Sequence, residues 1–317
     1  MTILIVGAGA TGGLFGARLA AAGRDVTYLV RPDRAALLAE RGLRITGPDG
    51  AAEVTRPRLA TADELAGPYD VVLVTVKATA LAPVIGEVGP AVGPGTAIVP
   101  VLNGMGHLSR LNAAFGPDRV LGGVALVSAQ LDRDGGVVQL TDGASLKIGA
   151  QDGQRSPVVK RAAGELSRAG FAFGVSGDIL AEMWAKWAFI ASASAANCLL
   201  GGSVGEIAAV DGGERCVRAV VGEVQAVARA AGYRLARRSA ASMTATLTAA
   251  GSPFTASLYR DLRAGRPVEV EPVLGDLVAV AREEGVPVPL LEAATVALRV
   301  QQARRAAGVS GLRGTPA

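Results

Sequence analysis

Lys186 is the residue whose surroundings most clearly suggest chemistry. The segment 187–205 that follows it contains no charged residue. A lysine among apolar neighbours is costly unless its charge is used or its pKa is lowered. Partial burial would bring the pKa of this amine towards roughly 7–8, the range in which a lysine serves as a general acid. We therefore predict that Lys186 donates a proton in catalysis; the alternative is a purely structural lysine.

Lysine is rare in this chain, which favours the catalytic interpretation. Of 32 basic residues only four are lysines, and they stand at positions 77, 147, 160 and 186. Lysine can lose its proton at a usable pH, whereas arginine cannot. A retained lysine therefore suggests a site where arginine would not serve. For Lys147 and Lys160, chance escape from a coding bias towards arginine stays a plausible alternative.

A second group of polar residues lies in segment 255–276. Ser257 and Asp261 are four residues apart, so they would share one face of a helix. Glycine at 265 and proline at 267 break that helix, and Glu269 stands just before the next one. Glu269 is a candidate partner for Lys186, although the helix dipole alone also favours a carboxylate near a helix N-terminus.

The N-terminus carries a fingerprint for dinucleotide binding. Gly7, Gly9 and Gly12 form G-x-G-x-x-G directly after an apolar strand pattern and at the head of a helical one. In this motif the first glycine permits a tight turn, the second lets the backbone approach a pyrophosphate, and the third lets helix and strand pack closely. Ala10 and Thr11 would supply amide donors to the phosphates. A glycine-rich turn without a ligand is the alternative.

The end of the second strand pattern favours NADPH over NADH. A site selective for NAD would place Asp or Glu there, on the ribose 2′-hydroxyl. Here the position holds Arg31, with Arg34 one turn on, and guanidinium groups suit a 2′-phosphate. Lys77 and Asn103 each follow a later strand pattern, at the sheet edge where ligands of such folds bind. A strand-end charge and an Asn-Gly turn are the respective structural alternatives.

Composition and charge exclude several classes of protein. The 317 residues carry a formal charge of +4 without a dense basic cluster, so we expect no nucleic-acid partner. The two cysteines form no disulfide framework, which fits a reducing cytoplasm. Segment 187–205 contains serines, glycines and an asparagine, so we interpret it as a buried helix and its end, with no membrane span. A single histidine and the absence of Tyr-x-x-x-Lys exclude two common dehydrogenase designs.

Strand and helix patterns alternate through the first half of the chain. Apolar or β-branched runs at 2–6, 25–30, 70–76 and 96–102 are typical of buried parallel strands. With the helical patterns between them, they predict an α/β fold of the Rossmann type with a doubly wound sheet. Shorter strand patterns within 120–175 suggest antiparallel additions to the same sheet.

A change of pattern near residue 178 predicts a second domain. From there to about residue 305, alanine-rich helical patterns replace the strand patterns. We expect an NADP-binding domain at 1–178, an all-helical substrate and catalytic domain at 179–305, and a disordered tail at 306–317.

Several motifs together resemble the ketopantoate reductase (2-dehydropantoate 2-reductase) family. They are GAGATGG at the N-terminus, VTVKA with Lys77, LNG with Asn103, WAKW with Lys186, and SLYRDLRAGRPVEV with Ser257, Asp261 and Glu269. The resemblance covers nearly the whole chain. It implies reduction of a 2-oxo acid by NADPH, in the cytoplasm and in pantothenate biosynthesis.

The same resemblance implies roles for individual residues. Lys186 would be the general acid, and Glu269 its partner and the anchor of the substrate. Asn103, Ser257 and Asp261 would contact the substrate. Lys77 would lie near the nicotinamide, where Asn103 would also contact the cofactor.

Two positions depart from the family's pattern. The family usually has asparagines four and eight residues after the helix lysine, whereas this chain has Ile190 and Ser194. We still assign both to substrate binding, but Ile190 cannot hydrogen-bond a substrate hydroxyl, and Asn197 is a candidate substitute. Two alternatives stay open: a ketone or imine reductase of another pathway, and a non-catalytic NADP-binding sensor. The expected partner is a small-molecule 2-oxo acid, and a homodimer stays open.

Overall fold

The computed structural model describes residues 1–307, which form two compact units. Unit 1 comprises Met1–Leu102 and His107–Met183; unit 2 comprises Asn103–Gly106 and, among the described residues, 184–307. The sequence placed a boundary near residue 178, whereas the units divide after Met183, within helix α6 (Ile179–Leu200). The tail predicted at 306–317 lies, from residue 308, outside the described residues.

Unit 1 is built on a five-stranded parallel sheet with the order β5-β2-β1-β6-β7. Its strands are β1 (Thr2–Val6), β2 (Asp25–Leu29), β5 (Arg58–Ala60), β6 (Val71–Val74) and β7 (Ala97–Pro100). The chain leaves β1 for β2 and β5 on one side and returns to β6 and β7 on the other. The winding therefore switches between β1 and β6, which confirms the doubly wound sheet. Ligands of such sheets bind at the carboxyl ends of the strands beside the switch.

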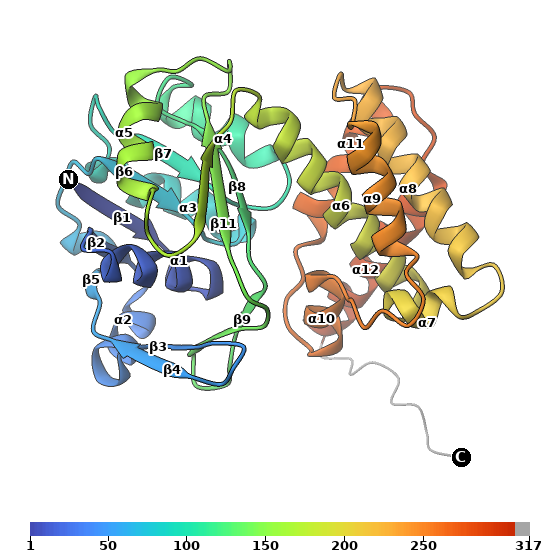
Figure 1. The fold of residues 1–317 in the computed structure, drawn as a ribbon, viewed down its shortest axis with the longest axis horizontal. Helices are drawn as coiled ribbons and strands as arrows, with labels where there is room; N and C mark the ends of the chain where they lie inside the picture. Colours follow the sequence, from blue (N-terminus) through green and yellow to red (C-terminus); the bar gives the residue numbers. More distant parts are fainter. Residues whose placement is uncertain (308–317) are drawn as a thin grey trace. The chain divides into compact units, whose positions relative to one another are not determined.

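Helices cover this sheet, and the first three of them also connect its strands (Figure 1). They are α1 (Ala10–Ala21), α2 (Pro32–Arg41), α3 (Leu81–Glu87), α4 (Gly106–Phe115) and α5 (Pro157–Leu166). Helix α1 packs on β1 and β2, and α5 packs on β6 and β7. Large apolar side chains such as Ile3, Phe15 and Tyr28 are fully buried in the core between these layers.

The expectation for 120–175 is only partly right. Strands β8 (Gly122–Leu126), β11 (Ser145–Gly149) and β12 (Ala172–Val175) form a separate sheet, linked to β7 by a single bridge between Ile98 and Val120. Strands β8 and β11 are antiparallel, as predicted, but β11 and β12 are parallel. The reason is that helix α5 joins β11 to β12, and a helical crossover connects parallel neighbours.

A third sheet has the order β4-β3-β10-β9. It consists of two hairpins, β3 (Leu43–Thr46) with β4 (Ala52–Thr55), and β9 (Ala129–Leu131) with β10 (Val137–Gln139). The first hairpin was not predicted, although Asp49-Gly50 between short alternating runs is a hairpin signal. Strands β3 and β10 pair in parallel, and α1 packs against both.

The regular elements of unit 2 are all helices among its described residues, as expected. Its elements are α6, α7 (Val204–Ala208), α8 (Gly213–Ala230), α9 (Arg237–Leu247), α10 (Ser257–Arg263), the π-helix η4 (Glu271–Gly275), α11 (Asp276–Glu283) and α12 (Pro289–Ala306). Buried valine, leucine and alanine side chains of α6, α8, α11 and α12 form its core. Within residues 1–307 we find no helix with both the length and the apolar character needed to cross a membrane.

Candidate active site

The glycine loop after β1 has the geometry that a dinucleotide phosphate requires. Gly7 has a φ of +97°, which residues with a side chain rarely adopt. A Cβ on Gly12 would lie 2.0 Å from the Gly7 carbonyl oxygen and 2.3 Å from Oγ1 of Thr75, so only glycine fits there. A Cβ on Gly9 would meet no atom within 4 Å, which leaves open space beside the backbone. The residues present therefore fit a dinucleotide phosphate.

Ala10 and Thr11 are the first residues of α1, directly after this loop. The N-cap residue is Gly9, which has no side chain to cap the helix, and no acidic residue stands in the first turn. The amides of the first turn therefore have no capping side chain. In this position they can donate to phosphate oxygens, and the helix dipole favours the negative charge.

The two arginines after β2 differ in their surroundings. Arg31 is exposed at the N-cap of α2 and is free to meet a 2′-phosphate. Arg34 instead donates from Nε and Nη2 to the carbonyl oxygen of Ala8, at 3.2 and 2.8 Å, and from Nη2 to that of Gly135, at 2.9 Å. Arg34 is thus committed to the backbone, so Arg31 is the better candidate for phosphate recognition.

Lys77 lies at the same sheet edge as the glycine loop. It follows β6, whose last residue Val74 pairs with Val6 of β1. Thr75, the residue after Val74, donates its hydroxyl to the Gly7 carbonyl oxygen at 2.9 Å. The Lys77 side chain is exposed. Its proximity to a nicotinamide stays a prediction.

Lys186 lies on α6, within unit 2. Burial lowers the pKa of its amine to about 8, from an ordinary value of 10.5. Within residues 1–307 no hydrogen bond or ion pair to this amine is found, so desolvation is not offset by a partner charge. This amine can hold or release a proton near neutral pH, as a general acid must. Its pairing with Glu269 stays a prediction.

Trp187, the neighbour of Lys186, links α6 to η4. Its fully buried indole donates from Nε1 to the carbonyl oxygen of Val273 at 2.9 Å. The π-helix that contains Val273 begins two residues after Glu269. One hydrogen bond therefore connects the segment that carries Lys186 with the segment that follows Glu269. A buried indole N–H generally needs an acceptor, but the sequence does not show which residue supplies it. The signal for this hydrogen bond was therefore weak.

Glu269 and Glu271 have separate surroundings, although the sequence could not tell them apart. Glu271 forms a bidentate pair with Arg299 of α12, in which Nε and Nη2 donate at 2.8 and 2.6 Å. This hydrogen bonding lowers the pKa of Glu271. Glu269 is half-buried just before the helical turn that begins at Val270. Arg299 thus commits the Glu271 carboxylate to α12, and the catalytic role of Glu269 stays a prediction.

Two further side chains of α12 bind the backbone of α10 and of the segment that connects it to η4. Gln302 donates from Nε2 to the carbonyl oxygen of Val268 at 2.8 Å. Arg305 donates to the carbonyl oxygens of Arg266 and Leu262 at 2.6 and 2.5 Å. Residues three apart lie on one face of a helix, so Arg299, Gln302 and Arg305 form a single row along α12. Sequence reasoning missed this row, although the spacing was readable.

Asn103 lies in the loop that belongs to unit 2 by its contacts. The loop packs directly on η4, because a Cβ on Gly104 would lie 2.1 Å from the carbonyl oxygen of Pro272. Gly104 also has a φ of +81°, so glycine is required twice over. The half-buried Asn103 is therefore held beside the same π-helix to which Trp187 connects Lys186.

Ser257 is exposed at the start of α10, and a buried asparagine positions that start. Asn197 accepts the amide of Ala256 on Oδ1 and donates from Nδ2 to the carbonyl oxygen of Gly202, both at 2.8 Å. Asn197 is 0% exposed. Its side chain is thus committed to the backbone, which argues against the suggestion that it replaces a missing substrate ligand.

Asp261 accepts a hydrogen bond from Nε of Arg266 at 2.7 Å, within the turn that follows α10. The amide of Arg266 also donates to the carbonyl oxygen of Asp261 at 2.8 Å. These contacts shape the connection that leads to Glu269. Contact between Asp261 and a substrate stays a prediction.

The two positions that depart from the family's pattern have different environments on α6. Ile190 is half-buried, whereas Ser194 is 0% exposed. Within residues 1–307 the Ser194 hydroxyl has no hydrogen-bond partner, and neither has that of Ser192. Of the two positions, Ile190 is therefore the better placed to meet a substrate.

Comparisons with known proteins show the family to which the chain belongs. The family model described as Ketopantoate reductase PanE/ApbA matches residues 3–153, and that of its C-terminal part matches residues 178–302. An uncharacterized oxidoreductase of Bacillus subtilis, YkpB, is 31% identical over 96% of this chain and 100% of its own length.

Solved structures give the same result. A 2-dehydropantoate 2-reductase from Geobacter metallireducens is 28% identical and superposes with a TM-score of 0.84 over 95% of this chain and 99% of its own. A D-mandelate dehydrogenase in complex with NADH and anilino(oxo)acetate shares the fold, with a TM-score of 0.85 at 20% identity over 96% of this chain and 99% of its own. The chain therefore belongs to the ketopantoate reductase PanE/ApbA family and is an oxidoreductase.

Proposed function

We propose that this protein reduces a 2-oxo acid to a 2-hydroxy acid with NADPH, as in the conversion of ketopantoate to pantoate. The observation that carries the proposal is the desolvated amine of Lys186, whose pKa lies near 8 and which has no partner charge among the described residues. Family membership supports the class of substrate, and the exposed Arg31 after β2 supports NADPH. The cytoplasmic location and the homodimer stay predictions.

Each candidate residue has a task in this reaction. The nicotinamide cofactor, when bound, supplies the hydride. Lys186 donates its proton to the oxygen of the ketone, where negative charge develops. Glu269 orients the amine and the substrate, and Asn103 and Ser257 bind the substrate through an amide and a hydroxyl. The glycine loop and the first turn of α1 bind the phosphates.

A panel of 2-oxo acids tests the proposal. Purified protein is mixed with each acid and either NADPH or NADH, and cofactor consumption is followed by fluorescence. We expect turnover with branched 2-oxo acids and a preference for NADPH. Binding of NADPH without turnover of any ketone would instead support the sensor alternative. A preference for NADH would refute the assignment of Arg31.

A second candidate function keeps the scaffold and changes the substrate. Ile190 favours it, because an isoleucine at a position that usually holds asparagine presents a methyl group to the ligand. A polar group left without a partner in a closed site is strongly unfavourable. A ketone or imine of another pathway, with an apolar branch in place of a hydroxyl, would then be the preferred substrate. Ketones and cyclic imines added to the panel decide between the two.

A further inference from the structure

Arg34 makes contacts that no role in binding a 2′-phosphate explains. Two of its nitrogens converge on the carbonyl oxygen of Ala8, the residue between the first two glycines of the fingerprint. Nη2 also donates to the carbonyl oxygen of Gly135, in the turn between β9 and β10. A Cβ on Gly135 would lie 2.5 Å from Nη1, so the turn passes directly against the guanidinium. Arg34 thus joins the glycine loop to a turn that is distant in the sequence.

The contact with Ala8 fixes the direction of the next amide. A trans peptide is planar, so its carbonyl and its N–H point to opposite sides. With the Ala8 carbonyl turned to Arg34, the amide of Gly9 points away from Arg34. Beside Gly9 the space is open, since an added Cβ would meet no atom within 4 Å. A cation on the carbonyl also polarises the peptide and strengthens its N–H as a donor to an anion.

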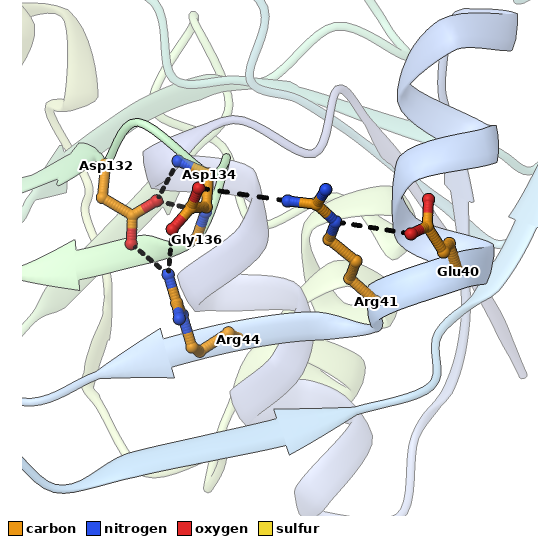
Figure 2. A network of polar contacts seen from close by, with 6 residues as sticks. All are labelled: Glu40, Arg41, Arg44, Asp132, Asp134 and Gly136. Carbon is orange, nitrogen blue, oxygen red and sulfur yellow. Dashed lines mark hydrogen bonds and ion pairs between the residues drawn. The ribbon is translucent and has the colours of Figure 1, made fainter.

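Further polar contacts hold the turn that accepts from Arg34 (Figure 2). Asp132 accepts the amides of Asp134 and Gly136 on Oδ1, at 2.9 and 2.8 Å. Its Oδ2 accepts from Nη2 of Arg44 on β3 at 2.7 Å. Asp134 lies 3.6 Å from the same nitrogen and 3.9 Å from Nη1 of Arg41 on α2. The turn is therefore tied to β3 and α2 by a network of charges.

Charge supports the same interpretation. Desolvation by burial lowers the pKa of Arg34, and the nearby charge of Asp132 opposes this effect. Desolvation would raise the pKa of Asp132, but its hydrogen bonds from Gly136 and Arg44 outweigh this and lower it. Asp132 thus stays ionised beside the guanidinium at neutral pH.

We propose that Arg34 is a positioning residue for the cofactor, which fixes the Ala8–Gly9 peptide towards the pyrophosphate and serves NADPH and NADH alike. This proposal rests on the proposed function only in requiring that a nicotinamide dinucleotide binds to the glycine loop. It separates the two arginines after β2: Arg31 would read the 2′-phosphate, and Arg34 would shape the loop.

Binding titrations test the proposal without catalysis. The dissociation constants of NADPH and NADH are measured by fluorescence for the wild type, Arg34→Lys, Arg34→Met and Arg31→Met. Loss of charged hydrogen bonds predicts that both Arg34 variants bind each cofactor about 10- to 100-fold more weakly, with an unchanged ratio between the two. Arg34→Lys keeps a positive charge. Weaker cofactor binding by this variant would therefore show that the planar geometry of the guanidinium matters. Arg31→Met should weaken NADPH alone.

Two controls make the result decisive. Thermal unfolding shows whether each variant is folded, and adenosine 2′-monophosphate, which lacks the pyrophosphate, should bind the Arg34 variants as it binds the wild type. A loss confined to NADPH, or unchanged binding of both cofactors in a folded Arg34 variant, would overturn the proposal. Failure of the wild type to bind either cofactor would instead refute the proposed function and, with it, this inference.

Discussion

In unit 1 the glycine motif of the phosphate loop is one short stretch, 7–12, whereas in unit 2 the substrate and catalytic candidates come from segments far apart in the sequence. The glycine loop depends on backbone conformation and on positions where no Cβ fits. The candidates of unit 2 depend on side chains that reach distant backbone groups, such as Trp187 on Val273 and Asn197 on Ala256. A contiguous motif is therefore readable from the sequence alone, but a site assembled by long-range hydrogen bonds is not.

The largest expected effect is that of replacing Lys186. Lys186→Met should lower turnover by about 10²–10⁴, the usual contribution of a positioned acid, while NADPH binding by unit 1 stays unchanged. Lys186→Arg should fail similarly, because arginine keeps its proton. Lys147→Met is the matched control, since Lys147 forms an exposed ion pair with Glu182. Wild-type turnover in Lys186→Met would make Lys186 structural.

The same variant should be more stable than the wild type. The folded-state pKa of Lys186, about 8, lies below its ordinary value of 10.5, so the unfolded state binds more protons between these values. The stability of the wild type therefore rises as the pH rises through this window. At pH 7 the buried charge is a cost, so Lys186→Met should raise the free energy of unfolding by about 1–3 kcal/mol. Urea unfolding at pH 7 measures it, and a loss of stability would contradict it.

Substitution of Ile190 sharpens the comparison within unit 2. Ile190→Asn should shift the preference towards ketopantoate over a hydroxyl-free analogue by about 1–3 kcal/mol, since a hydrogen bond to the hydroxyl becomes available. Ile190→Leu, which stays apolar, should cause no such shift. The measurement is kcat/KM for both acids. A wild type that already prefers ketopantoate by several orders of magnitude would show that another residue binds the hydroxyl.

The pH dependence of reduction should follow the Lys186 amine. The protonated form is the donor, so kcat/KM should fall about tenfold per pH unit above pH 8, where that form is lost. The residual activity of Lys186→Met should lack this decline. A rate that stays level up to the pH at which an ordinary lysine titrates would assign the proton to another group.

The smallest effect is expected for the hydrogen bond of Trp187. Trp187→Phe leaves the Val273 carbonyl buried without its donor, which should cost about 1–3 kcal/mol of stability and lower kcat several-fold. NADPH binding should not change, because unit 1 is untouched. Trp184→Phe is the matched control: Trp184 stacks on Tyr233, with 5.0 Å between the ring centroids. Equal losses of kcat in both variants would show that the effect of Trp187→Phe comes from lost packing and not from the lost hydrogen bond.

The limits of prediction follow from the same contrast. The parallel sheet, the glycine fingerprint and the helical second unit were predictable, because their signals are periodic or contiguous. The separate sheet of β8, β11 and β12 was missed, since pairing between strands depends on the helix between β11 and β12. The different environments of Glu269 and Glu271 could not be read either, because Arg299 lies 28 residues beyond Glu271. Likewise, the contact of Arg34 with the turn at Gly135 spans 101 residues.

The row of side chains on α12 has a consequence for where the chain can be shortened. A protein that ended before Arg299 would still contain every residue to which binding or proton transfer is assigned here. It would lack the three side chains that hold the connection leading to Glu269. Such a shortened relative would match at every candidate position and yet hold its carboxylate on an unsupported segment. For proteins of this kind, the length of chain beyond Glu269 is therefore as informative as the identity of the site residues.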